Sequence, residues 1–200
     1  MGKLVTILGF AATTACATLA VCWPGRTYAD PPETFYEAGM VDLLGKMGTT
    51  GPRRVLLKGL LEYRELLGRL GYTEGLQFVD GSFVENIEIR KSRPPSDIDV
   101  FSFLVRPGQY RSDPALWAST GFSEWSKEVV DRTINKQRFG LDTYAVAADG
   151  LSPLQIINQT VYWYSLFSHK RVTHDWKGFL QIPLNASDDA AARAALVGTL

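Results

Sequence analysis

The run Asp97-Ile98-Asp99-Val100, in which acidic and apolar residues alternate, constrains the fold more than any other feature. In a β-strand, successive side chains point to opposite faces, so the two carboxylates project together while Ile98 and Val100 enter a core. Two like charges placed this way repel each other, and a divalent cation between them removes that cost. Mg²⁺ is the usual cation held by a few carboxylates together with substrate phosphates. The run therefore predicts a buried strand over 97–105 with a metal-binding end.

A tight turn precedes this strand. The short apolar run 76–80 predicts a strand that ends at Gly81-Ser82. Glycine lets the backbone approach a phosphate closely, and serine offers a hydroxyl and a backbone amide. We therefore expect Gly81 and Ser82 to bind the phosphates of a nucleotide.

A third carboxylate is needed if two metal ions are to be held. Such sites use roughly three carboxylates, and Asp142, at the start of a strand expected over 141–147, is our choice for the third. Lys136 and Arg138 lie just before that strand and could contact a triphosphate. A solvated helix end explains these two cations equally well.

The remaining elements follow from apolar spacing. Helical periodicity predicts helices over 52–70, 123–136 and 153–167, the last with four inward residues, Leu154, Ile157, Val161 and Leu166. A strand over 178–184 precedes a C-terminal helix with acids in its first turn. This order of elements predicts an α+β fold with a mixed central sheet flanked by helices.

An aromatic run near residue 165 is expected to pack under the sheet rather than stack on a base; it comprises Tyr162, Trp163, Tyr164 and Phe167. Three basic residues follow it, His169, Lys170 and Arg171. They could lie near a base or an acceptor, and a charged helix end explains them without function.

The first 39 residues differ in character from the rest. Lys3 precedes an apolar run, Leu4 to Trp23, followed by small residues, which is the order of a secretory signal and just long enough to span a bilayer. A mis-assigned start is another interpretation, because helix-like patterning begins after Met40. We divide the chain into a segment over 1–39 and one domain over 40–200. A membrane is an expected partner only if the segment is a true anchor.

Composition excludes several functional classes. The formal net charge is zero, so the chain lacks the broad basic surface that would hold a long DNA. Both cysteines, Cys16 and Cys22, lie in the first segment, which excludes a disulfide framework or a cysteine zinc site in the domain. With His169 and His174 as the only histidines, a histidine zinc site is not expected.

The turn and the acidic strand together resemble the nucleotidyltransferase superfamily that includes polymerase beta, whose pattern is an apolar residue, Gly, Gly or Ser, a spacer, and Asp-apolar-Asp-apolar. Uncharacterised stand-alone bacterial domains of this superfamily are more similar, over about 54–184. The sequence departs from the pattern at Asp80, where the superfamily prefers an apolar residue. The resemblance implies a nucleotidyltransferase-like domain over 40–200 that binds Mg²⁺ and a nucleotide through Ser82, Asp97 and Asp99, with Asp142 as the matching third acid.

The expected function is Mg²⁺-dependent transfer of a nucleoside monophosphate from an NTP to an acceptor hydroxyl, in the cytoplasm, where NTP is available. The acceptor could be a protein side chain, an RNA end or a small molecule such as an aminoglycoside. One alternative is a catalytically silent nucleotide-binding or toxin–antitoxin interaction module. Another is an exported domain that binds Ca²⁺ through its acids.

Overall fold

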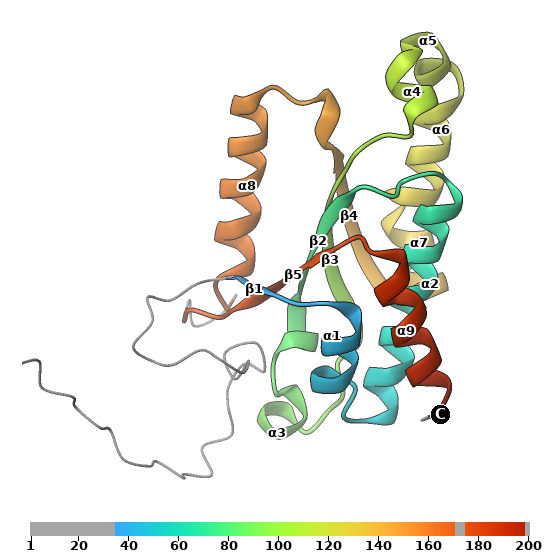
Figure 1. Ribbon diagram of the computed structural model, residues 1–200. Coiled ribbons are helices and arrows are strands. Elements are labelled where there is room, and N and C mark those ends of the chain that lie inside the picture. The colour runs from blue at the N-terminus through green and yellow to red at the C-terminus, as the bar shows by residue number, and fades with distance from the viewer. Residues whose placement is uncertain (1–34, 171–174, 199–200) are drawn as a thin grey trace, which may run out of the picture.

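A five-stranded mixed sheet forms the centre of the protein (Figure 1). The computed structural model describes residues 35–170 and 175–198. The strand order is β1-β5-β2-β3-β4, with β1 parallel to β5, β3 parallel to β4, and antiparallel pairing elsewhere. The strands are β1 (Phe35–Glu37), β2 (Gly75–Asp80), β3 (Ile98–Leu104), β4 (Leu141–Ala147) and β5 (Phe179–Pro183). Together with its helices, this sheet confirms the predicted α+β class.

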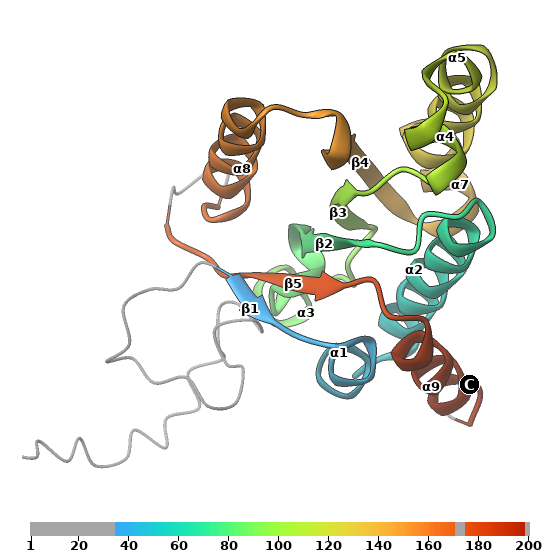
Figure 2. The ribbon, with the colours of Figure 1, turned by 45° about the horizontal axis from the view of Figure 1, so that its top comes forward.

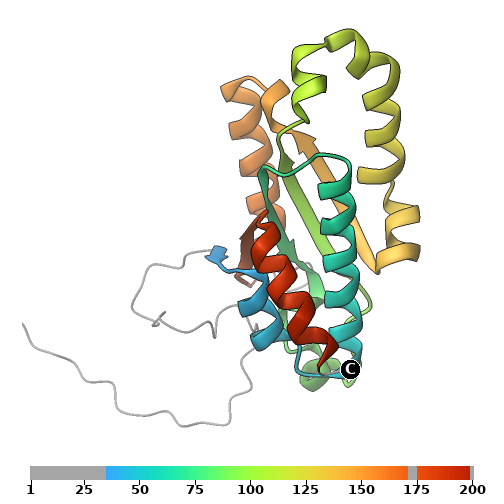
Figure 3. The same cartoon turned by 45° about the vertical axis from the view of Figure 1, so that its right-hand side comes forward.

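Helices cover the two faces of the sheet unequally (Figure 2). One face carries most of them, including α1 (Met40–Met47), α2 (Gly51–Arg69), α7 (Arg132–Phe139) and α9 (Ala186–Val197). Figure 3 shows α2 and α9 side by side over this face. Of the helices in the described residues, only α8 (Pro153–Phe167) lies over the opposite face. A short 3₁₀ turn, η2 (Gly81–Val84), and α3 (Ile87–Lys91) link β2 to β3 at one end of the sheet.

Alternation along the strands divides the core into two clusters. In β3, Ile98, Val100 and Leu104 enter the larger cluster under α2, while Phe101 points to the opposite face. There Phe101 stacks on Trp163 of α8, with ring centroids 4.3 Å apart. Asp99, the acid within β3, occupies a position that alternates with the larger cluster, so it shares the α8 face with Phe101.

Most of the predicted elements are confirmed. The helix expected over 52–70 is α2, which begins with Pro at its first turn, and the strand over 141–147 is β4 with the same bounds. The expected strands over 76–80, 97–105 and 178–184 are β2, β3 and β5. The C-terminal helix is α9, and Asp188 and Asp189 lie in its first turn.

The orientation predicted for α8 is wrong. Its bounds agree with the prediction, but the four residues expected to point inward are exposed, Leu154 by 66%. The helix instead buries Trp163 and Phe167, which lie four residues apart and pack on the aromatic residues of the sheet. This helix carries no charged residue to mark its solvent face, so apolar periodicity selected the wrong stripe.

The region between β3 and β4 is also more elaborate than predicted. Between the strand expected over 97–105 and the helix expected over 123–136, the structure contains α4 (Gly108–Ser112) and α5 (Pro114–Leu116). The helix expected over 123–136 is interrupted: η3 (Trp117–Gly121), α6 (Phe122–Glu124) and η4 (Trp125–Val129) precede a break, and α7 begins at Arg132. The side chain of Asp131 accepts a hydrogen bond from the backbone N–H of Ile134, which caps the new helix and explains the break.

The N-terminal segment is only partly described. Residues 1–34, which contain the apolar run from Leu4, lie outside the described residues. The sheet begins upstream of residue 40, because β1 pairs with β5 from Phe35 to Glu37. Within 35–170 and 175–198, no helix is both long and apolar enough to cross a membrane.

Candidate functional site

Three aspartates from adjacent strands form a row across the sheet. Asp80 in β2 is the register partner of Asp99 in β3, and Asp99 is the register partner of Asp142 in β4. Register partners project from the same face, so the three carboxylates lie next to one another on the α8 face. Asp97 precedes β3 and lies near the row, because Lys136, which pairs with Asp97, also interacts electrostatically with Asp142 and Asp99. The structure thus places two of the expected acids, Asp99 and Asp142, in register, with Asp80 on the other side of Asp99.

The turn after β2 lies directly against this row. Gly81 adopts a left-handed conformation with φ of 84°, and a Cβ atom there would overlap the Asp99 carboxylate. Only glycine combines that backbone angle with so close an approach. Ser82 follows as a half-buried residue of η2.

A buried arginine from α2 fixes the turn from behind. Arg53 donates through Nη1 to the backbone oxygen of Phe83 at 2.6 Å and through Nη2 to that of Glu85 at 2.7 Å. Its Nε also pairs with Glu88 in α3 at 2.6 Å, and this bond lowers the pKa of the Glu88 carboxyl. Because Arg53 is only 1% exposed, these charge-assisted bonds are shielded from water and hold η2 and α3 together.

Two cations from α7 pair with the acids. Lys136 Nζ lies 2.5 Å from Asp97, and Arg132 Nε and Nη2 donate to the two oxygens of Asp142 at 2.6 and 2.8 Å. These pairings raise the pKa of both Lys136 and Arg132. The two cations are four residues apart and so share one face of α7. Arg138 does not join them, because it pairs with Glu128 of η4 at 2.8 Å.

A buried lysine pairs with the remaining acid. Lys177 Nζ lies 2.8 Å from Asp80 Oδ2 and 3.9 Å from Glu85, and both Lys177 and Asp80 are nearly inaccessible to solvent. Burial raises the pKa of Asp80 to about 7 despite this cation, and the nearby Asp99 raises it further. Asp80 Oδ1 is buried without a hydrogen-bond partner among the described residues. The ion pair between Asp80 and Lys177 was not predicted from the sequence. Its one sequence signal is Asp80 itself, an acid at the position before Gly81 where the superfamily pattern has an apolar residue.

The aspartates of the row are suitable metal ligands by residue type, but their carboxylates are too far apart to bind one ion together. Carboxylate oxygens are the ligands that Mg²⁺ prefers, and the orphaned oxygen of Asp80 adds a further acceptor to the row. Over the described part of the chain, no three His, Cys, Asp or Glu side chains stand close enough to hold one ion as they are placed. The cations explain this spacing, because Lys136 and Arg132 hold Asp97 and Asp142 in ion pairs.

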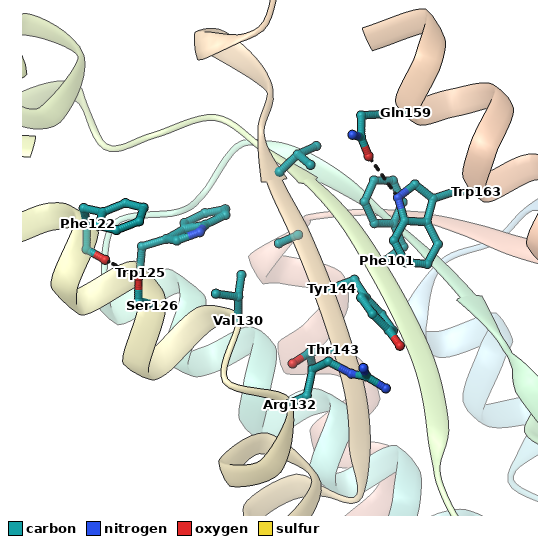
Figure 4. Close-up of a pocket in the computed structure, with 12 residues that line it drawn as sticks. Phe101, Phe122, Trp125, Ser126, Val130, Arg132, Thr143, Tyr144, Gln159 and Trp163 are labelled. Atoms are coloured by element: carbon teal, nitrogen blue, oxygen red, sulfur yellow. Dashed lines mark hydrogen bonds between the residues drawn. The ribbon is translucent and has the colours of Figure 1, made fainter. Parts of the chain in front are cut away.

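A cavity of about 450 Å³ lies along the outer edge of β4 (Figure 4). On one side it is bounded by Trp163 and Gln159 of α8, and on the other by Trp125 and Ser126 of η4. Residues 143–146 of β4 form its floor, and Arg132 closes the end nearest the acids. The guanidinium of Arg132 also lies over the ring of Tyr144, 4.3 Å from its centroid.

The two described basic residues after α8, His169 and Lys170, have partners other than the aspartates of the row. His169 packs on the ring of Trp176, 4.2 Å between centroids, and Lys170 pairs with Asp175. Arg171 lies outside the described residues. The aromatic run is divided: Trp163 and Phe167 pack under the sheet as expected, whereas Tyr162 is exposed.

Comparison with known proteins identifies the family. Residues 25–183 match the model of DUF6932, described as a family of unknown function. The match covers most of the chain and ends with β5, so the protein belongs to this family. Neither the curated proteins nor the solved structures contain a match to the chain.

Proposed function

We propose that the protein is a Mg²⁺-dependent nucleotidyltransferase that moves a nucleoside monophosphate from an NTP to an acceptor hydroxyl. The observation that carries this proposal is the row formed by Asp99 and Asp142 beside the glycine turn. A phosphate bound at Gly81 would lie next to the Asp99 carboxylate, because these two residues are in close contact. Nucleotidyl transfer needs mainly positioning and neutralisation of the phosphate charge, and the row supplies carboxylate ligands for the metal that would provide both.

Asp97, Asp99 and Asp142 would hold the metal, which when bound offsets charge on the phosphates and favours the nucleophilic form of the acceptor oxygen. Ser82 would donate its hydroxyl and the turn its backbone amide to the phosphates. Lys136 and Arg132 would leave their carboxylates and pair with the triphosphate, because its oxygens offer cations a higher negative charge. The same movement would bring the acids within reach of one ion.

The test is release of pyrophosphate. Purified protein is incubated with Mg²⁺, each NTP in turn and a cell extract as the source of acceptor, and Asp142→Asn is compared with the wild type. Asp149→Asn is a matched control, because Asp149 pairs with Arg106 at 2.9 Å and has 16% side-chain exposure against 14% for Asp142. We expect Asp142→Asn to abolish release and Asp149→Asn to retain it. Equal release by all three proteins would refute the proposal.

A silent nucleotide-binding module, such as one half of a toxin–antitoxin pair, is the second candidate function. Three internal ion pairs favour it, because Asp80, Asp97 and Asp142 each have a cationic partner within the chain. This candidate predicts Mg²⁺-dependent nucleotide binding with no pyrophosphate release. An NTP-dependent function under either candidate places the protein in the cytoplasm, where NTP is available.

A further inference from the structure

The outer edge of β4 presents unpaired backbone groups inside the cavity. The backbone N–H of Ile98 donates to Gly140 O, which sets the phase of the β3–β4 ladder. In a parallel pair, alternate residues bond the neighbouring strand, so residues 142, 144 and 146 face β3. Thr143, Ala145 and Ala147 then direct their N–H and C=O groups outward. Among the described residues, none bonds these outward groups except the Ala147 C=O, which, as the N-cap oxygen of the 3₁₀ turn η5 (Ala148–Gly150), accepts the first bond of that turn.

We propose that this edge binds an extended segment of another protein as an added strand, and that a serine, threonine or tyrosine hydroxyl of the segment is the acceptor of the nucleotidyl group. The inference rests on the proposed function and names its acceptor class. A row of outward N–H and C=O groups is complementary to an extended peptide backbone, which is the basis of strand addition at sheet edges.

The walls of the cavity favour a peptide over the other possible occupants. The edge lies recessed between α8 and η4, so the equally recessed edge of a second copy cannot reach it (Figure 4). An RNA end would need cations along its path, and the lining holds one charged residue, Arg132, which already pairs with Asp142. Aromatic and aliphatic side chains on both walls suit the alternating side chains of a single strand.

Register brings the acceptor to the acids. A peptide residue paired with Asp142 projects from the same face as Asp142, whichever direction the peptide runs. Its hydroxyl therefore stands beside the acid row. Arg132 begins in α7, on the opposite face of the sheet, and reaches around the outer edge to Asp142, so the segment must displace it. Docking of the acceptor would thereby release a carboxylate that the metal needs.

The transfer step balances with an NTP as the only co-reactant. The acceptor oxygen forms a bond to the α-phosphorus, and the bond from that phosphorus to the oxygen bridging to the β-phosphorus breaks. Pyrophosphate leaves with the electron pair, and the hydroxyl proton passes to water. The products are a nucleotidylated protein and pyrophosphate.

Proline substitutions test the edge, because proline removes one outward N–H and its ring obstructs an incoming strand. Ala147 already has φ of −79°, close to the proline value, so Ala147→Pro preserves the fold. Ala145→Pro blocks the centre of the edge. Ala145→Ser and Ala147→Ser are matched controls that keep the N–H. Circular dichroism and the affinity for Mn²⁺ with an NTP establish that each variant is folded and binds nucleotide.

The full chain is incubated with Mg²⁺, α-³²P-labelled NTPs and a cell extract, and the product is digested with proteinase K or with RNase. We expect protease-sensitive label that mass spectrometry maps to a hydroxyl side chain, reduced about tenfold by either proline and little by serine. Label in RNA or in a small molecule, or undiminished protein label in the folded proline variants, would overturn the protein acceptor and leave the proposed function standing. Absence of label with every NTP would overturn both the acceptor and the proposed transfer, and Mn²⁺–NTP binding without label would then favour the silent nucleotide-binding module.

Discussion

Replacing Asp80 by Asn should change how stability depends on pH. The carboxyl of Asp80 is buried beside Lys177, and its pKa in the folded protein is raised from 3.8 to about 7. Between these values the folded state holds a proton that the unfolded state has lost, so the free energy of unfolding falls as pH rises. The slope is about 1.4 kcal/mol per pH unit, which amounts to about 2 kcal/mol between pH 5 and pH 7.

Urea unfolding of the wild type and of Asp80→Asn at pH 5, 6 and 7 measures this effect. Asparagine does not titrate, so the wild type should lose about 2 kcal/mol relative to the variant across this range. Lys177→Met provides a control, because losing the cation that lowers the pKa should make the decline continue above pH 7. The opposite outcome is a difference in free energy of unfolding between the wild type and Asp80→Asn that stays constant, or shifts in favour of the wild type, as pH rises. Either result would show that Lys177 keeps Asp80 ionised and would refute the reasoning.

Three further predictions concern the turn and α8. Gly81→Ala should weaken Mn²⁺–NTP binding measured by calorimetry, because the new Cβ overlaps the Asp99 carboxylate at a positive φ; unchanged affinity would argue against a role for the turn. Arg53→Met should lower the free energy of unfolding by about 3–5 kcal/mol in urea titrations, because it leaves buried acceptors without their donor, and a loss below 1 kcal/mol would contradict this. On α8, Trp163→Ala should cost about 3–5 kcal/mol while exposed Leu154→Gln changes stability by about 0.5 kcal/mol or less, and similar costs for the two would show that the helix packs by another face.

Local sequence signals predicted the strands that carry the acids. The alternation from Asp97 to Val100 and the apolar run of β4 are both short-range patterns, and the structure places Asp99 and Asp142 in register. The glycine turn was equally readable, because its position depends on one residue with an unusual backbone angle. Such features depend on residues close together in the chain, which sequence reasoning handles well.

Features that depend on distant residues were missed. Lys177 meets Asp80 only because β5 lies beside β2 in the sheet, and no local pattern announces that pairing. Arg138 was expected either to contact a triphosphate or to form a solvated helix end; it pairs with Glu128, because a separation of two residues from Lys136 places it on another face of α7. Apolar spacing alone also could not orient α8, because that helix carries no charged residue to mark a solvent face.

The central claim is that carboxylates from neighbouring strands converge with the glycine turn into one metal–nucleotide site. Electron paramagnetic resonance of Mn²⁺, titrated with protein and a non-hydrolysable NTP analogue, tests it most directly. The account predicts that Asp99→Asn and Asp142→Asn each weaken Mn²⁺ binding about tenfold or more, whereas Asp149→Asn binds like the wild type. Equal Mn²⁺ binding by all four proteins would contradict it.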